Sequence, residues 1–270
     1  MCTVSVLAWR ERAAHETAPA ARAAAPRRLI RLACNRDEQR SRPAALPPVR
    51  RRCGAREAVL PIDPVSGGTW IAVNDTGLIA TLLNVYDVPA RAARCAFDGR
   101  RSRGEIIPDL MRCSNLDEAA PRARRLDPER YPPFRLVLVD RASWIELRTD
   151  GVVASCTAPR PVIEPSMFTS SGLGDERVEA PRRAVFDELL GALPASVPAD
   201  QLAAAQDAFH RHRWPDKPHV SVCMEREEAL TVSHTVVEVA PDSVAMEYYG
   251  APPDRDATPV RVRIPTLQGS

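Results

Sequence analysis

The sequence has almost no lysine, few aromatic residues and no long apolar run. Lys217 is the single lysine among 37 basic residues, so arginine clusters follow the general composition and say little about function. The net charge is only +2, which excludes a strong field that would attract nucleic acid or an anionic membrane. No apolar run reaches the ~20 residues of a membrane helix, and residues 3–9 are too short for a secretory signal. We therefore expect a cytoplasmic protein with no membrane span and no nucleic-acid partner.

The sequence also lacks the cysteine pattern of a disulfide framework. Its seven cysteines are scattered and contain no Cys-x-x-Cys pair, and free cysteine packs as a small hydrophobic residue. The residues that could form a zinc site are His210, His212, His219 and Cys223. Their spacing fits no standard zinc finger. We expect reduced, mostly buried thiols, no metal and no cofactor.

The length and composition are those of an ordinary globular protein. The chain has 270 residues, of which 44% are hydrophobic, so it can bury a sizeable core. No internal repeat or low-complexity linker divides it, and we expect a single domain over residues 1–270. Residues 10–28 and 39–66 are rich in arginine and proline and lack apolar periodicity. Both segments are predicted to be exposed loops.

Hydrophobic periodicity predicts strands first, helices in the middle and strands again at the end. The predicted strands cover 2–9, 29–34, 67–73, 78–85, 134–139, 143–149, 152–157, 219–224, 231–240, 243–249 and 258–264. The predicted helices cover 103–112, 116–125, 181–193 and 199–211. This order favours antiparallel sheets covered by helices over an alternating β–α–β array. The clearest hairpin turns at 74–77, Asn-Asp-Thr-Gly. Pro181 is expected to start its helix, and Asp200 to cap the last one.

Cys2 offers a specific chemistry if Met1 is removed, which is the expected processing before a small residue. Removal leaves a free α-amine beside a thiol. An α-amine has an ordinary pKa of ~7.7–8.0, so it is a competent base near neutral pH. It can take the thiol proton directly or through one water and so activate the nucleophile. From position alone, however, Cys2 is more often an incidental residue.

Several motifs occur in order along the chain and together carry a family resemblance. They are Cys2-Thr3-Val4, Ala33-Cys34-Asn35-Arg36-Asp37-Glu38, Ser41-Arg42-Pro43, Gly67-Gly68-Thr69-Trp70, Gly77 to Asn84, Ser102-Arg103-Gly104-Glu105 and Thr231-Val232-Ser233-His234-Thr235. This set resembles the NRDE family, also called the transport and Golgi organisation protein 2 family, which is named after the string at 35–38. The resemblance implies an N-terminal-nucleophile hydrolase-like fold. Such a fold is a four-layer α/β/β/α sandwich of antiparallel sheets in the α+β class.

The resemblance extends to penicillin V acylases and bile salt hydrolases, which cleave a non-peptide amide with an N-terminal cysteine. Cys2 matches their nucleophile, and Asn84 matches an oxyanion-hole asparagine. Arg36 and Asp37 are the best matches to an arginine and an aspartate near the amine and thiol. These implied roles are physically sensible. Arg36 would lower the thiol pKa, Asp37 would hold the α-ammonium, and the Asn84 amide would stabilise an oxyanion.

Further residues are expected to line the same site. They are Asn35, Glu38, Thr69, Trp70, Ser171 and Ser233. The sequence departs from the hydrolases at two places. Ser171 stands where a second asparagine is expected, and Val232-Ser233-His234 stands where a late arginine is expected. Gly67-Gly68 serves either ligand contact or close strand packing.

Two functions stay open on this resemblance. The first is a cysteine amidohydrolase that acts on a linear, non-peptide amide of a small molecule. The alternative is a non-catalytic protein on the same fold that handles haem, lipid or acyl-CoA, which rests on family analogy alone. A small-molecule ligand or substrate is expected in either case.

Overall fold

Two antiparallel sheets form the centre of the structure, a computed structural model that describes residues 2–10, 28–86, 100–194 and 196–267. The first sheet has six strands in the order β11 (Ser166–Ser170), β1 (Cys2–Arg10), β2 (Arg28–Gln39), β12 (Ala229–Val239), β13 (Ser243–Tyr249) and β14 (Val260–Pro265). The second has eight strands, with a main path of β10 (Arg160–Pro161), β8 (Ser143–Thr149), β7 (Phe134–Val139), β6 (Ile79–Asn84), β5 (Ile71–Asn74), β4 (Arg56–Ile62) and β3 (Leu46–Cys53). The short strand β9 (Ala154–Cys156) pairs with β8.

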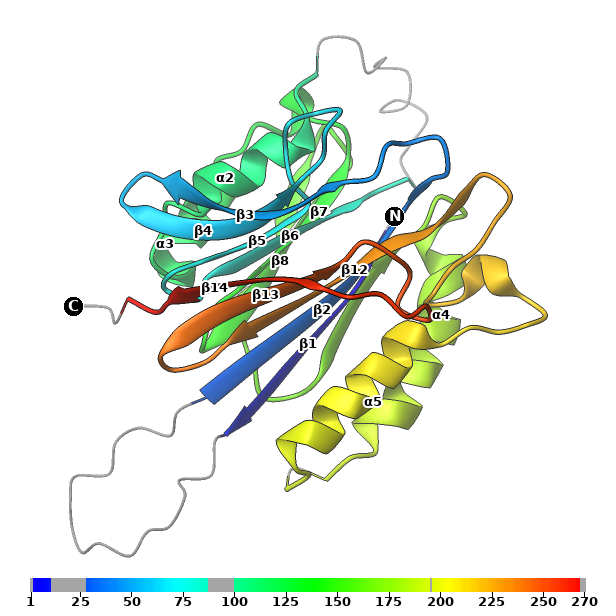
Figure 1. Ribbon diagram of the computed structural model, residues 1–270. Helices are drawn as coiled ribbons and strands as arrows, with labels where there is room; N and C mark the ends of the chain where they lie inside the picture. The colour runs from blue at the N-terminus through cyan, green and yellow to red at the C-terminus, as the bar shows by residue number, and fades with distance from the viewer. Residues whose placement is uncertain (1, 11–27, 87–99, 195, 268–270) are drawn as a thin grey trace, which may run out of the picture.

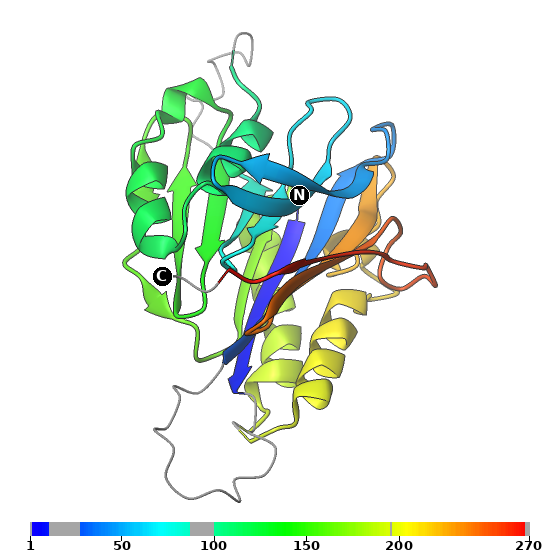
Figure 2. The same ribbon diagram turned by 60° about the vertical axis from the view of Figure 1, so that its left-hand side comes forward.

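Helices cover the outer face of each sheet, so the molecule has four layers (Figures 1 and 2). The second sheet packs against α2 (Ile106–Leu110) and α3 (Leu116–Arg124). The first sheet packs against α4 (Asp175–Phe186), a π-helical turn (Asp187–Gly191) and α5 (Ala199–Arg211). The α/β/β/α sandwich predicted from the sequence is confirmed.

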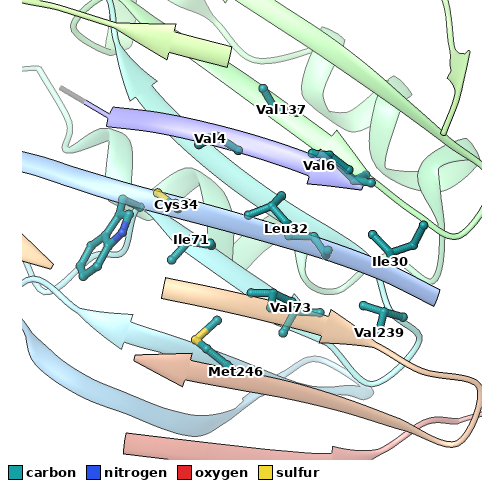
Figure 3. Packing of buried hydrophobic residues seen from close by; sticks show 14 of the residues in the cluster. Val4, Val6, Ile30, Leu32, Cys34, Ile71, Val73, Val137, Val239 and Met246 are labelled. Carbon is teal, nitrogen blue, oxygen red and sulfur yellow. The ribbon is translucent and has the colours of Figure 1, made fainter. Parts of the chain in front are cut away.

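The main core lies between the sheets, where alternate residues of each strand point inward (Figure 3). Inward residues from three of the strands are Val4, Val6, Ile30, Leu32, Ile71 and Val73. Each such side chain contributes about 1.5–3 kcal/mol when it is fully buried. Because the side-chain period of a strand is two, this layer determines which face of β1 turns inward. Cys2 shares the face of Val4 and Val6, while Thr3 and Ser5 contact the helix side.

The hairpin of β5 and β6 turns as the sequence predicts. Asn74 Oδ1 accepts hydrogen bonds from the backbone nitrogens of Thr76 and Leu78, at 3.2 and 3.0 Å. Gly77 has a φ of 89°, which is a conformation that favours glycine. The turn directs β6 back along β5, so Asn84 comes to the same end of the sandwich as Cys2, where both line one cavity.

Four local predictions are wrong. The segment 39–66 was predicted to be a loop, but it contains β3 and β4; β3 is an edge strand with a mostly exposed burial pattern, so its sequence is polar. The segment 219–224 forms a 3₁₀ turn (Pro218–Val220) and irregular chain instead of a strand. The helix expected from Pro181 starts at Asp175, and Asp200 makes no capping bond.

The predicted loop at 10–28 falls almost entirely outside the described residues, because the structure describes nothing between residues 10 and 28. Within the ranges that are described, no helix combines the length and the apolar character that crossing a bilayer requires.

Two glycines bring the segment at 102–104 against the start of β5. A Cβ added to Gly68 would lie 2.7 Å from backbone atoms of Gly104, and one added to Gly104 would lie 2.8 Å from the nitrogen of Thr69. The contact is held by a hydrogen bond from Thr69 N to Gly104 O at 3.2 Å. Gly68 therefore serves close backbone packing, one of the two alternatives drawn from the sequence.

We predict that Gly68→Ala lowers the free energy of unfolding by about 1–3 kcal/mol, because the backbone of Gly104 must move away. Gly191→Ala is the control, since its added Cβ would make an ordinary 3.5 Å contact with Asp187 Cβ. That variant is expected to be unchanged or more stable by about 0.4–1 kcal/mol. Urea unfolding measures the free energy of unfolding of both variants. Equal values for Gly68→Ala and Gly191→Ala would contradict the close packing of Gly68 on Gly104.

Candidate active site

A cavity of about 290 Å³ opens at one end of the sandwich, where β1 begins and where β2 and β6 end, near the loops after β4 and before η1 (Arg103–Glu105). The four residues matched to catalytic roles all line it; these are Cys2, Arg36, Asp37 and Asn84. Three of the expected lining residues do so as well, namely Glu38, Thr69 and Trp70. Residues that lie far apart in the sequence are thus brought to one place by the antiparallel strands.

Strand register fixes the position of Cys2 in the wall of this cavity. Cys2 pairs with Arg36 of β2 on one side and with Ser170 of β11 on the other. Because Val4 pairs with Cys34, the side chains of Cys2 and Cys34 are diagonal neighbours on the inward face of the sheet. Cys2 is only 5% exposed, so its thiol is shielded from bulk water.

The Cys2 thiol is influenced most by a second thiol that sequence analysis did not single out. A hydrogen bond with Cys34 lowers the pKa of Cys2, and it outweighs the opposing effect of burial. The same contact, together with burial, raises the pKa of Cys34 well above its ordinary value. Cys34 therefore holds its proton more strongly than Cys2 and is the donor in this contact. Arg36 also lowers the pKa of Cys2, as the resemblance implied, but by less.

The backbone nitrogen of Cys2 lies beside polar groups. It donates to Ser170 Oγ at 3.2 Å, and it is the nitrogen that becomes the α-amine if Met1 is removed. Asp37 is almost completely buried near this end of β1 and accepts a 2.6 Å bond from Thr231 Oγ1. Burial raises the pKa of Asp37, while the charge of Arg182 acts in the opposite direction.

Arg36 is tied into a charged cluster on the cavity wall. Its Nη2 lies 2.8 Å from Asp63 Oδ2 and 3.2 Å from Glu38 Oε2, and its guanidinium stacks over the Trp70 ring at 4.5 Å. Arg42 binds the same Asp63 through two bonds of 2.9 and 3.0 Å. This cluster neutralises its own charges, which accounts for the modest effect of Arg36 on the thiol.

Asn84 ends β6 with its side chain in the cavity. One amide hydrogen donates to Tyr86 Oη at 3.0 Å, which fixes the orientation of the amide. The amide has two N–H groups, so a second donor is available for a bound oxyanion.

Three expected lining residues, Asn35, Ser171 and Ser233, are not among the residues that line this cavity. Asn35 follows Cys34 and therefore points to the helix side of β2. Ser171 is completely buried, and its Oγ accepts a 2.8 Å bond from Arg226 Nη2. Ser233 pairs with Arg36 in register and contacts the Tyr248 hydroxyl.

Asn35 instead organises a buried polar network under α5. Its Oδ1 accepts from Nδ1 of His210 at 3.0 Å and from Nδ1 of His234 at 2.8 Å. An amide oxygen is only an acceptor, so both histidines carry their proton on Nδ1 and Nε2 of His210 accepts from Ser5 Oγ at 2.7 Å. Burial lowers the pKa of His234 to about 3, so its ring stays neutral. The Ser5 and His210 side chains are sealed from solvent, and the network is structural.

Comparison with protein families identifies the chain. The family model described as Transport and Golgi organisation 2 matches residues 19–246. The chain belongs to this family. The resemblance drawn from its motifs is therefore confirmed. The matched region begins after β1, so membership in the Transport and Golgi organisation 2 family carries no statement about Cys2.

Among solved structures, this family member is similar to the Caenorhabditis elegans N-acylethanolamine-hydrolyzing acid amidase (NAAA) ortholog. The TM-score is 0.55 at 12% sequence identity, and the match covers 86% of this chain and 91% of that chain. At this identity the likeness shows the fold, which is N-terminal-nucleophile hydrolase-like. A search of curated protein sequences finds no match.

Two arginines near the site of this Transport and Golgi organisation 2 family member escaped sequence analysis. Arg182 of α4 is completely buried and donates to Thr3 Oγ1 at 2.9 Å and to Thr169 Oγ1 at 2.6 Å, behind β1 and β11. Arg226 binds Ser171, and its charge interacts with Asp37. Arg226 thus places an arginine near Asp37, although residues 232–234 contain none. The arginine-rich composition hid both residues, since neither stands in a motif.

The Cys34 contact gives a testable pH dependence. Cys34→Ala removes the donor, so the pKa of Cys2 rises and less thiolate is present at neutral pH. Alkylation of Cys2 by iodoacetamide at pH 7 is expected to slow by roughly tenfold, and its midpoint to move to higher pH. Cys34→Ser keeps a donor and should retain most of the reactivity. Mass spectrometry of the Cys2 peptide measures the rates; unchanged profiles for both variants would show that Cys34 has no influence.

Proposed function

We propose that this protein is a cysteine amidohydrolase that uses Cys2 as an N-terminal nucleophile and cleaves linear amides other than peptide bonds. The observation that carries the proposal is the meeting of Cys2, Asp37 and Asn84 in one cavity at the end of the sandwich. The lowered pKa of Cys2 supports a reactive thiolate. The hydrolase-like fold supports the reaction class by analogy.

In the proposed reaction, removal of Met1 frees the α-amine of Cys2. The amine accepts the thiol proton, and the thiolate attacks the carbonyl carbon of the amide. The free N–H of Asn84 donates to the oxyanion of the tetrahedral intermediate. Its collapse breaks the C–N bond, the α-ammonium protonates the leaving amine, and a thioester remains on Cys2. A water molecule, activated by the same α-amine, then hydrolyses the thioester and releases a carboxylic acid.

The neighbouring residues support these steps without forming or breaking covalent bonds themselves. Cys34 donates to the Cys2 thiolate and so favours the nucleophilic form. Asp37 provides a carboxylate near the α-amine, where it can hold the ammonium form. Ser170 Oγ accepts from the same nitrogen and orients it.

The non-catalytic alternative, handling of haem, lipid or acyl-CoA, receives no support from the cavity. Ionisable side chains dominate its lining; they are Arg36, Asp37, Glu38, Arg42, Asp63 and Arg103. A hydrocarbon chain or a porphyrin placed against these groups would remove water from charges without replacing its hydrogen bonds. A small polar amide suits such a lining better.

The test is turnover of a panel of small N-acyl amines and N-acyl amino acids. Cys2→Ala is expected to reduce kcat/KM for any hydrolysed amide by at least about 10³-fold, because the nucleophile is lost. Cys156→Ala is the control, since Cys156 lies in β9 on the second sheet and outside the cavity lining. Hydrolysis that survives in Cys2→Ala would contradict the proposal, as would ligand binding without turnover in the native protein.

A further inference from the structure

Arg103 differs from Arg36 and Arg42, the other arginines of the cavity, because it forms no ion pair with a carboxylate of the described residues. Arg36 and Arg42 share Asp63 and Glu38. Arg103 is half-buried in the cavity wall, and its Nη1 donates to Pro133 O at 2.9 Å. Throughout the described ranges, no carboxylate oxygen lies within 4.0 Å of its guanidinium nitrogens. Pro133 O uses one of its five N–H donors.

The backbone holds Arg103 firmly in this position. Ser102 Oγ accepts from Gly104 N at 3.3 Å and caps the short turn η1. The carbonyl of Gly104 accepts from Thr69 N at 3.2 Å, and the close packing of Gly68 on Gly104 leaves no room for a shift. The backbone that carries the Arg103 side chain is therefore a turn held by hydrogen bonds and close packing.

A partly desolvated cation without a counter-ion favours the binding of an anion. Burial lowers the pKa of Arg103, which reflects the unfavourable loss of water around its charge. An anionic ligand would remove this penalty, and a planar guanidinium matches the two oxygens of a carboxylate. Glu38 acts on the charge of Arg103 from beyond ion-pair distance, while it pairs directly with Arg36 and Arg42. Asp63 pairs with the same two arginines.

Arg103 and Cys2 both line this cavity, so one small molecule bound in it can reach both groups. A carboxylate bound to Arg103 would therefore be near the amide that Cys2 attacks. A cavity of about 290 Å³ leaves room for a small ligand only.

We propose that Arg103 binds a carboxylate of the substrate, and that the preferred substrates are small amides with an acidic group close to the scissile bond, such as N-acyl amino acids. This inference rests on the proposed function for its catalytic part. The binding part concerns Arg103 alone and can be measured without turnover.

The first measurement compares two probes of nearly equal shape, N-butyrylglycine and N-butyrylglycinamide, which differ in whether the terminal group is charged. Calorimetry with the Cys2→Ala variant, whose alanine also permits removal of Met1, gives their affinities without hydrolysis. We expect the carboxylate probe to bind at least about tenfold more tightly. Equal affinities, stronger binding of the amide, or no binding of either probe would overturn the inference.

The second measurement assigns the preference to Arg103. Arg103→Gln in the same background is expected to abolish the preference, and Arg103→Lys to keep part of it, since lysine retains the charge but not the bidentate geometry. Arg101→Gln is the control, because Arg101 is exposed and pairs with Glu105. A preference that survives both Arg103 variants would overturn the assignment; circular dichroism verifies that they fold.

The same probes separate this inference from the proposed function. With the native protein, kcat/KM should favour N-butyrylglycine, and Arg103→Gln should raise its KM far more than it lowers kcat. Tight, Arg103-dependent binding without any hydrolysis would refute the amidohydrolase and leave the carboxylate site standing. Equal hydrolysis of both probes would refute the carboxylate site and leave the amidohydrolase standing.

Discussion

The antiparallel pairing of β1 with β2 and β11 is the constraint on which the rest of this structure depends. It places the first strand of the chain inside the first sheet, with neighbours on both sides. Val4 and Val6 must face the core, and the two-residue period of the strand then turns Cys2 to the same face. A slip of one residue would expose the valines to the helix layer and move the thiol out of the cavity. The core therefore positions the candidate nucleophile.

The arginines that line the cavity differ in whether acidic residues pair with them. Arg36 is close to Cys2 in register, but Asp63 and Glu38 compensate its charge, so a contact with the neutral thiol Cys34 influences Cys2 more. Arg103 lines the same cavity and forms no ion pair within the described part of the chain. We infer that Cys34 lowers the pKa of the nucleophile Cys2, whereas Arg103 selects the ligand by its carboxylate.

Most of the fold could be predicted from the sequence because its elements carry their own periodicity. The alternation in β1, the apolar run of β7 and the Asn74–Gly77 turn each depend on local residues, and α5 begins and ends where predicted. Strand β3 was missed because an edge strand exposes most of its side chains, so its arginines and prolines resemble those of a loop.

Site residues could be predicted where they belong to a contiguous motif. Prediction failed for residues whose position depends on how strands are oriented or on contacts between distant segments. Asn35 belongs to the same motif as Arg36, yet the strand turns it to the helix layer, where two histidines bind it. No role was predicted for Cys34, because its influence on Cys2 comes from a diagonal contact between two strands. Arg226 lies far along the chain from the rest of the site, and no spacing rule connects it with Ser171.

The most direct test of the central claim is the intact mass of the protein isolated from a cell that processes its N-terminus normally. The proposed mechanism requires the α-amine to belong to Cys2, since only then do a base and a thiol share one residue at the start of β1. It predicts a mass that corresponds to a chain beginning at Cys2. A mass that includes Met1 would contradict it, because the nitrogen of Cys2 would then be an amide without basicity.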